Sequence, residues 1–335
     1  MHFQKRIRLD LGIFSALASL IIFSFSTPAT SLTEVSQWPK GHPGTTQFLI
    51  EPAIYSGHPG QTRDTFRTRT RFTHLLKDDP IVFPGQPGAS HLHMFFGNAL
   101  LNAFTTAYNI RTKCRSASAG GTANCTGYWV PALLDANDSV ILPDPNFEPA
   151  LYYKSGYTRS DPSQIAVPTP GLRMIAGDKN ATPGSPQTDK KAYFSCYAYP
   201  GNDQPYIMDC PQGSILEMTI AFPSCWDGQT LDSPDHKSHM AYAINDCPAT
   251  HPVILPDISF HFRFPINSSS GTAGWRLSSD MYDPSAQGGY SLHADWFNGW
   301  DPTVMERWVK NCEAQFDCVV DLLGDGEMLG SKLMF

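Results

Sequence analysis

Apolar and polar residues alternate in several short runs along the chain. The clearest run is 258–264, in which an isoleucine and three phenylalanines share one parity while Ser259, His261 and Arg263 share the other. A period of two is typical of a β-strand with one buried face. Similar runs predict further strands at 66–72, 107–114, 127–134, 192–199 and 215–222. The pattern therefore favours a mainly β protein.

Long segments between these strands have the composition of loops. Residues 135–190, 200–213 and 224–257 are rich in Pro, Gly, Asp and Ser, and structureless segments of this length are often functional. One helix is expected near the C-terminus, with Asp301 as its N-cap, Pro302 in its first position and an apolar side that reaches Cys312.

The expected architecture is a single β-sandwich or jelly-roll-like domain over residues 61–335, with long decorated loops and a short C-terminal helix. An irregular N-terminal arm, residues 30–60, precedes it. We find no internal repeat and no sharp change of composition after residue 60.

The first 29 residues have the pattern of a signal peptide. Basic residues at Lys5, Arg6 and Arg8 precede the apolar segment Leu11–Phe25, and the small residue Ala29 follows. The apolar segment is shorter than the roughly 18 residues that a membrane-spanning helix needs, although an uncleaved anchor is the alternative. We expect a secreted, extracellular protein without stable membrane insertion after cleavage.

Charge and composition exclude some partners. The formal net charge is −7, and loss of the basic leader makes the chain more acidic. A nucleic-acid partner would require a basic face, so none is expected. A neutral or cationic ligand, or a metal ion, is compatible with this charge, and we expect a monomer.

All eight cysteines follow the leader, and an even number in a secreted chain predicts disulfides. The sequence leaves their pairing open. The simplest arrangement joins nearest neighbours: Cys114 with Cys125, Cys196 with Cys210, Cys225 with Cys247, and Cys312 with Cys318.

The strongest local feature for chemistry is the segment Ser90–Asn98. If it is a strand, His91 and His93 lie on one side while Leu92 and Met94 lie on the other. Two imidazoles on one side of a strand are suited to bind a metal ion, with zinc, copper or calcium as the candidates, or to act as an acid–base pair. Hydrogen bonding that only supports the fold is the third interpretation.

More histidines and acids occur downstream. His239 follows an acidic stretch that contains Asp227, Asp232 and Asp235, and His293 stands two residues before Asp295. Histidine titrates near neutral pH and is a common metal ligand. We therefore expect four histidines to meet in one cleft and an aspartate to assist them; the histidines are His91, His93, His239 and His293.

Aromatic residues near these motifs could contact a sugar. Trp226, Trp296 and Tyr290 are the candidates, with Arg263 as a polar contact, although burial in the core is the alternative for each ring. Serine-hydrolase, zinc-protease, P-loop and dinucleotide-binding motifs are absent from the sequence.

Several multi-residue blocks resemble, in order, those of a large uncharacterised domain-of-unknown-function family of secreted proteins, found mostly in fungi and also in bacteria. The blocks include Asp79-Pro80-Ile81-Val82, Ser90-His91-Leu92-His93, Cys225-Trp226-Asp227-Gly228, Leu231-Asp232-Ser233-Pro234-Asp235-His236 and His293-Ala294-Asp295-Trp296. The resemblance implies a secreted, disulfide-bonded domain that is sometimes joined to carbohydrate-binding modules. It implies no particular activity. Met94 stands where we expect histidine in many members.

These observations lead to two main hypotheses. The first is a secreted carbohydrate-active enzyme, a hydrolase or lyase, that acts on an extracellular or cell-wall polysaccharide through a His/Asp cleft, with or without a metal ion. The alternative is a non-catalytic metal- or glycan-binding extracellular wall protein. A copper oxidoreductase is less favoured, because cleavage after Ala29 would place Thr30 rather than histidine first.

Overall fold

The computed structural model describes residues 39–54, 58–59, 65–145, 147–155, 161–313, 316–318 and 320–330. The expected signal peptide lies outside these residues. Within them, no helix is both long and apolar enough to cross a membrane.

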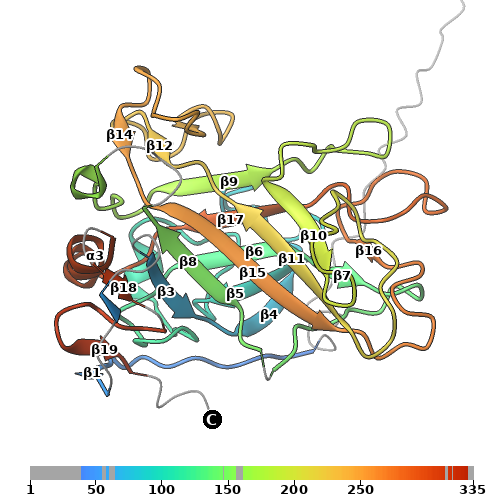
Figure 1. The fold of residues 1–335 in the computed structure, drawn as a ribbon, viewed down its shortest axis with the longest axis horizontal. Coiled ribbons are helices and arrows are strands. Elements are labelled where there is room, and N and C mark those ends of the chain that lie inside the picture. Colours follow the sequence, from blue (N-terminus) through green and yellow to red (C-terminus); the bar gives the residue numbers. More distant parts are fainter. Residues whose placement is uncertain are drawn as a thin grey trace, which may run out of the picture.

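Two β-sheets form the body of the protein (Figure 1). The seven-stranded sheet has the order β10 (Ala192–Cys196), β11 (Ile215–Ala221), β15 (Asp257–Pro265), β8 (Ala150–Lys154), β3 (Thr65–Arg69), β18 (Phe316–Cys318) and β2 (His58–Pro59). The five-stranded sheet has the order β4 (Phe72–Leu76), β5 (His93–Gly97), β6 (Gly127–Pro131), β17 (His293–Phe297) and β9 (Arg173–Gly177). Neighbouring strands are antiparallel except β3 and β18, which are parallel.

The two sheets pack face to face around one large core. Phe96 of β5 lies 4.5 Å, between ring centroids, from Phe262 of β15, and Tyr128 of β6 lies 5.4 Å from Phe260. All four rings are fully buried. Alternate residues of the longer strands in both sheets enter this core, which confirms the mainly β sandwich expected from the period-two pattern.

Smaller elements extend the two sheets. Strand β1 (Ile50–Pro52) pairs with β19 (Glu327–Leu329), and β7 (Leu133–Leu134) pairs with β16 (Arg276–Leu277). A three-stranded sheet places β12 (Cys225–Trp226) between β13 (Met240–Ala241) and β14 (Val253–Ile254). The helical elements are α2 (Asn109–Thr112), a 3-10 turn (Pro162–Gln164) and α3 (Pro302–Trp308), which continues into a π turn (Val309–Glu313).

The expected C-terminal helix is confirmed. The Asp301 side chain accepts hydrogen bonds from the backbone N–H groups of Thr303 and Val304, and Pro302 occupies the first turn. The strands expected at 127–134, 192–199 and 215–222 are also present, with shorter bounds, and the one expected at 258–264 is longer by one residue at each end.

Three expectations for local structure were wrong. Residues 107–114 contain helix α2 rather than a strand, because Asn109 and Thr106 exchange side-chain-to-backbone hydrogen bonds that begin a helical turn. The run 66–72 is divided, since the chain leaves the seven-stranded sheet after Arg69 and enters the five-stranded sheet at Phe72. The supposed loop 135–190 contains β8 and β9.

The four disulfides join nearest neighbours along the chain, as in the simplest arrangement: Cys114–Cys125, Cys196–Cys210, Cys225–Cys247 and Cys312–Cys318. The third bridge closes the segment between β12 and β14, which forms part of the wall of the site described next.

Candidate functional site

The candidate site lies on the outer face of the five-stranded sheet. In β5, Met94 enters the core while His93 and Phe95 lie on the opposite face. In β17, Ala294 and Trp296 enter the core. His293 and Asp295 therefore lie on the outer face, the same face as His93 and Phe95. Strand β6 separates β5 from β17, and Phe95 and Trp129 form a small apolar cluster beside the polar residues.

A loop between β4 and β5 covers this face. The two carboxylate oxygens of Asp78 accept hydrogen bonds from the backbone N–H groups of Gly88 and Ala103, each at 2.9 Å. Oδ1 of Asp79 accepts from Ile81 and Val82, also at 2.9 Å. These two aspartates give the loop its shape, and the loop in turn places Asp79 and His91 over the sheet.

Three imidazoles converge where this loop, which contributes His91, meets the sheet. The ring centroids of His91 and His93 are 4.1 Å apart, those of His91 and His293 5.0 Å, and those of His93 and His293 5.9 Å. Nδ1 of His93 donates to the backbone carbonyl of Asp78 at 2.9 Å, and Nδ1 of His293 donates to that of Ser291 at 2.8 Å. Because a carbonyl only accepts, Nε2 of each neutral ring carries the lone pair.

Several buried polar atoms of this cluster lack a hydrogen-bond partner among the described residues. They are Nε2 of His91, Nε2 of His93 and both carboxylate oxygens of Asp295. Donor atoms of His91, His93 and His293 lie within 4.8 Å of one another, and the same holds for Asp79, His93 and Asp295. Unpartnered polar atoms in a native interior are uncommon and require an explanation.

Burial determines the ionisation of the cluster. It raises the pKa of Asp295 well above its ordinary value, and the nearby carboxylate of Asp79 raises this pKa further. Burial and the neighbouring imidazole lower the pKa of His93 to about 3, and burial lowers that of His293 to about 4. The pKa of His91 is lowered by burial and by both other rings. All three imidazoles are therefore neutral at neutral pH.

A pocket of about 290 Å³ opens onto the cluster and includes His91, His293 and Asp295 in its lining. Lys179 and Lys237 also line it. Glycine at position 177 allows the wall to approach closely: it has a positive φ of 80°, and a Cβ there would lie 2.4 Å from the carbonyl oxygen of Leu292. Nζ of Lys237 donates to the carbonyl of Gly177 at 2.7 Å, which joins two walls of the pocket.

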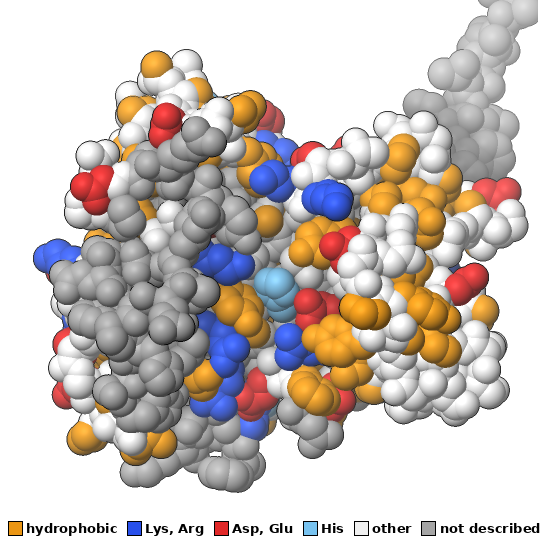
Figure 2. Space-filling model, viewed as in Figure 1, with side chains coloured by type: hydrophobic (Ala, Val, Ile, Leu, Met, Phe, Trp, Pro, Cys, Tyr) orange, Lys and Arg blue, Asp and Glu red, His pale blue; other side chains and the backbone are white. Residues whose placement is uncertain are grey.

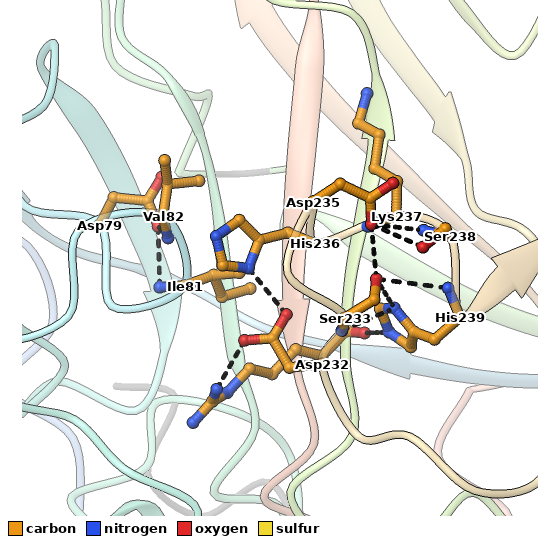
Figure 3. Close-up of polar contacts among 11 residues, drawn as sticks. Asp79, Ile81, Val82, Asp232, Ser233, Asp235, His236, Lys237, Ser238 and His239 are labelled. Atoms are coloured by element: carbon orange, nitrogen blue, oxygen red, sulfur yellow. Dashed lines mark hydrogen bonds and ion pairs between the residues drawn. The ribbon is translucent and has the colours of Figure 1, made fainter.

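The loop 232–239 forms the wall that faces the turn of Asp79 (Figure 3). Nδ1 of His236 lies 2.8 Å from Oδ1 of Asp232, and Oδ2 of this carboxylate accepts from Nη1 of Arg173 at 2.7 Å. In the figure, His236 extends toward the side where Asp79 lies. Asp235 lines the pocket, but its Oδ1 already accepts hydrogen bonds from the Ser233 and Ser238 hydroxyls. Asp235 therefore shapes this loop.

The structure brings together four of the expected site residues, His91, His93, His293 and Asp295, but His239 is not among them. Nε2 of His239 donates to the backbone carbonyl of Arg173 at 2.7 Å, and its Nδ1 lies 2.9 Å from the Ser233 hydroxyl. The ring lies on the far side of its loop from Asp79 (Figure 3). The expectation that all four histidines meet was wrong, because His239 is used to hold this loop to β9.

Two other candidates, Asp227 and Trp226, stabilise a turn away from the pocket lining. Asp227 accepts from the backbone N–H groups of Gln229 and Thr230 at 2.8 Å. Nε1 of the half-buried Trp226 donates to the Thr230 carbonyl at 2.7 Å.

The remaining expected sugar contacts are also outside the pocket lining. Trp296 is fully buried between the sheets and cannot stack on a ligand, so that expectation was wrong. Tyr290 packs against Tyr206 with 5.2 Å between ring centroids. Arg263 lies on the outer face of the seven-stranded sheet, where its Nε donates to Glu217 at 2.7 Å. Figure 2 shows a histidine at the surface with hydrophobic, acidic and basic side chains around it.

Sequence reasoning did not select Asp79, Lys179, His236 or Lys237 as site residues. Asp79 and His236 belong to the motif blocks, so their motifs were visible, but nothing in the spacing indicated that these blocks meet. Lys179 follows β9, a strand that the sequence analysis missed altogether.

The fold and the site together define a disulfide-bonded β-sandwich protein with a buried His/Asp cluster under a solvent-open pocket. The chain belongs to the family described as domain of unknown function DUF1996, whose family model matches residues 79–300. This match spans both the covering loop and β17. No curated protein and no solved structure matches the chain.

Proposed function

We propose that this protein is a secreted carbohydrate-active enzyme, a hydrolase or lyase, that acts on an extracellular or cell-wall polysaccharide in the pocket of His91, His293 and Asp295. The observation that supports this proposal is the set of buried, unpartnered polar atoms beneath a solvent-open pocket. Leaving such groups without partners costs free energy of folding, and such groups are concentrated at functional sites.

Two lysines of the pocket favour an acidic sugar, although Asp178 and Asp235 also line the pocket. Lys179 and Lys237 both line it, although the whole chain has a net charge of −7. Two ammonium groups at one opening attract an anionic ligand such as a uronate residue. Neutral imidazoles and a carboxyl group below them are suited to transfer protons or hold a cation.

The same two lysines favour a lyase over a hydrolase. Elimination from a uronate begins with removal of the proton next to its carboxylate, which places additional negative charge on that group. Fixed cations beside the carboxylate stabilise this charge as it develops. In this proposal Lys179 and Lys237 bind the uronate carboxylate, and a basic side chain of the pocket lining accepts the proton. The bond from the ring carbon to the departing sugar oxygen breaks as the carbon–carbon double bond forms, and that oxygen takes up a proton from water.

The test is digestion of a panel of neutral and uronate-containing polysaccharides by the purified protein, with reducing ends and the ultraviolet absorbance of unsaturated uronate as readouts. We expect cleavage of an acidic polymer. Replacing both lysines, Lys179→Gln with Lys237→Gln, should lower kcat/KM by about 10- to 100-fold, since it removes charge stabilisation. Lys190→Gln, at an exposed lysine that lines another hollow, is the matched control and should leave kcat/KM unchanged.

A folded protein that cleaves no polymer and is not retained by any glycan would contradict the proposal. Retention on an acidic glycan without cleavage would also contradict it and would support the non-catalytic wall protein instead. Cleavage that is equally fast in the double lysine variant would contradict the assignment of the substrate charge.

A further inference from the structure

The three converging imidazoles have the spacing of ligands to one metal ion. In a tetrahedral site with metal–nitrogen distances near 2.1 Å, ring centroids lie about 5 Å apart. The three centroid distances here, 4.1, 5.0 and 5.9 Å, are distributed around that value. Donor nitrogens of the three rings also lie within 4.8 Å of one another, so small ring rotations would complete the site.

The hydrogen bonds of two of these rings are those of metal-binding histidines. His93 and His293 each donate Nδ1–H to a backbone carbonyl, which fixes the tautomer and directs the lone pair of Nε2 away from that bond. Metal ligands are commonly oriented in this way. The Nε2 atoms of His91 and His93 are buried and accept no hydrogen bond from the described residues.

The adjacent carboxyl group gives an independent reason for a cation. Both oxygens of Asp295 are buried without a partner, and one of them lies within 4.8 Å of a ring nitrogen of His93. Burial disfavours the ionised form of an unpaired carboxyl group, and a bound cation would supply the opposite charge that the ionised form needs. No Lys or Arg within the described part of the chain forms an ion pair with Asp295.

We propose that His91, His93 and His293 bind one divalent transition-metal ion of the zinc class, with the Asp295 carboxylate beside it as the compensating negative charge. His91 and His293 line the pocket, so the remaining coordination position faces the place where a ligand would enter. The proposal rests on the proposed function, since it concerns the same pocket. It adds a metal ion bound by the residues at the base of that pocket.

A competing arrangement would use Asp79, His93 and Asp295. His93 can offer only Nε2 to a metal ion, because its Nδ1 is hydrogen-bonded to a carbonyl. Both arrangements need this one atom, so two metal ions cannot occupy them at the same time. Asp79 already accepts two backbone hydrogen bonds, which makes it the less available ligand. A set of three imidazoles favours zinc over calcium or magnesium, which prefer oxygen ligands.

The experiment measures metal binding to the purified protein in the absence of any substrate. The protein is dialysed against a chelator, and Zn²⁺ is then titrated with calorimetry and with elemental analysis of the desalted complex. We expect one Zn²⁺ per chain and a higher Tm in the zinc-bound form. Ca²⁺ in the same assay should not compete.

Two ligand variants and one control sharpen the test. His91→Ala changes a ligand on a loop, which should leave the fold intact, and His293→Ala changes a ligand on a strand. Each should weaken Zn²⁺ binding by about 100-fold or more, while His251→Ala, outside the cluster, should bind like the unchanged protein. Circular dichroism of each variant establishes that it is folded.

A folded protein that retains no zinc, or a His91→Ala variant that binds zinc as tightly as His251→Ala, would overturn the metal proposal. Because binding is measured without substrate, a protein that binds no zinc and still cleaves a polysaccharide would refute the metal site and leave the enzyme proposal intact. Zinc binding without cleavage of any polymer would support the metal site and refute the enzyme proposal.

Discussion

His93 and Met94 are neighbours in the chain, yet one side chain lies in the polar cluster and the other in the core. The same is true of Asp295 and Trp296 in β17. The period of two along a strand correctly predicted that His293 and Asp295 share a face. The same rule places Trp296 on the opposite face, so the sugar contact proposed for this tryptophan was inconsistent with the position of its own neighbour.

Residues in loops were harder to place than residues in strands. The position of His239 depends on hydrogen bonds to Ser233 and to Arg173, and Arg173 is 66 positions away in the sequence. A sequence pattern contains no information about such a contact. The four disulfide pairs, by contrast, followed the shortest separations along the chain.

Glu217 provides a prediction at the scale of one residue. Burial opposes its ionisation, but hydrogen bonds from His261, Arg263 and Tyr197 outweigh this effect and lower its pKa to about 2. The folded protein therefore holds this proton less tightly than the unfolded chain, and acid favours unfolding. The free energy of unfolding should fall as the pH drops from about 4.3, the ordinary value for glutamate, toward 2.

In Glu217→Gln the fall in the free energy of unfolding over this pH range should be smaller by about 1–2 kcal/mol. This figure is reduced for solvent screening. Urea unfolding at a series of pH values measures it. Glu306→Gln, at an exposed position, is the control and should keep the dependence of the unchanged protein. Identical pH profiles for Glu217→Gln and the unchanged protein would contradict the assignment.

At the scale of elements, the strands with clean alternation were more predictable than those without it. Strand β15 has four buried residues of one parity between Ile258 and Phe264, whereas β8 and β9 each have a charged residue only at one end, Lys154 and Arg173. Such a run shows no period of two and cannot be distinguished from an apolar part of a loop. Because β9 was missed, the loop after it and Lys179 were missed as candidate site residues.

The N-cap of helix α3 gives a prediction at this scale. Asp301 caps the helix and also forms an ion pair with Arg111 at 2.9 Å. Asp301→Ala loses both interactions and should lower the free energy of unfolding by about 1–2 kcal/mol in urea denaturation. Asp301→Asn keeps a capping oxygen and loses only the charge, so its loss should be below about 1 kcal/mol. Equal losses in the two variants would show that the cap contributes nothing.

At the scale of the whole molecule, hydrogen bonds in the core connect the two sheets. The hydroxyl of Tyr153, in β8 of the seven-stranded sheet, lies 3.1 Å from that of Tyr128 in β6 of the five-stranded sheet. It also accepts from Nε1 of Trp300 at 3.0 Å and from Nε1 of Trp296 at 3.4 Å. One buried hydroxyl therefore satisfies polar groups from both layers.

Tyr153→Phe would leave the Trp300 N–H group buried without its acceptor, which should cost about 2–3 kcal/mol of unfolding free energy. Tyr152→Phe, one position away on the outer face, removes a hydroxyl that contacts Arg67 at 3.3 Å and should cost less than about 1 kcal/mol.

Tryptophan fluorescence and circular dichroism should report coincident transitions if both sheets unfold as one unit. Separate transitions would contradict a shared core.

Strand β17 has a further consequence for how the protein is made. His93 belongs to β5 and His293 to β17, and β17 is held between β6 and β9 in the sheet. During synthesis the ribosome therefore releases the first two histidines long before the third. Contacts that are so distant in sequence form late in folding. The imidazole cluster can therefore assemble only after residue 293 of the 335-residue chain has emerged.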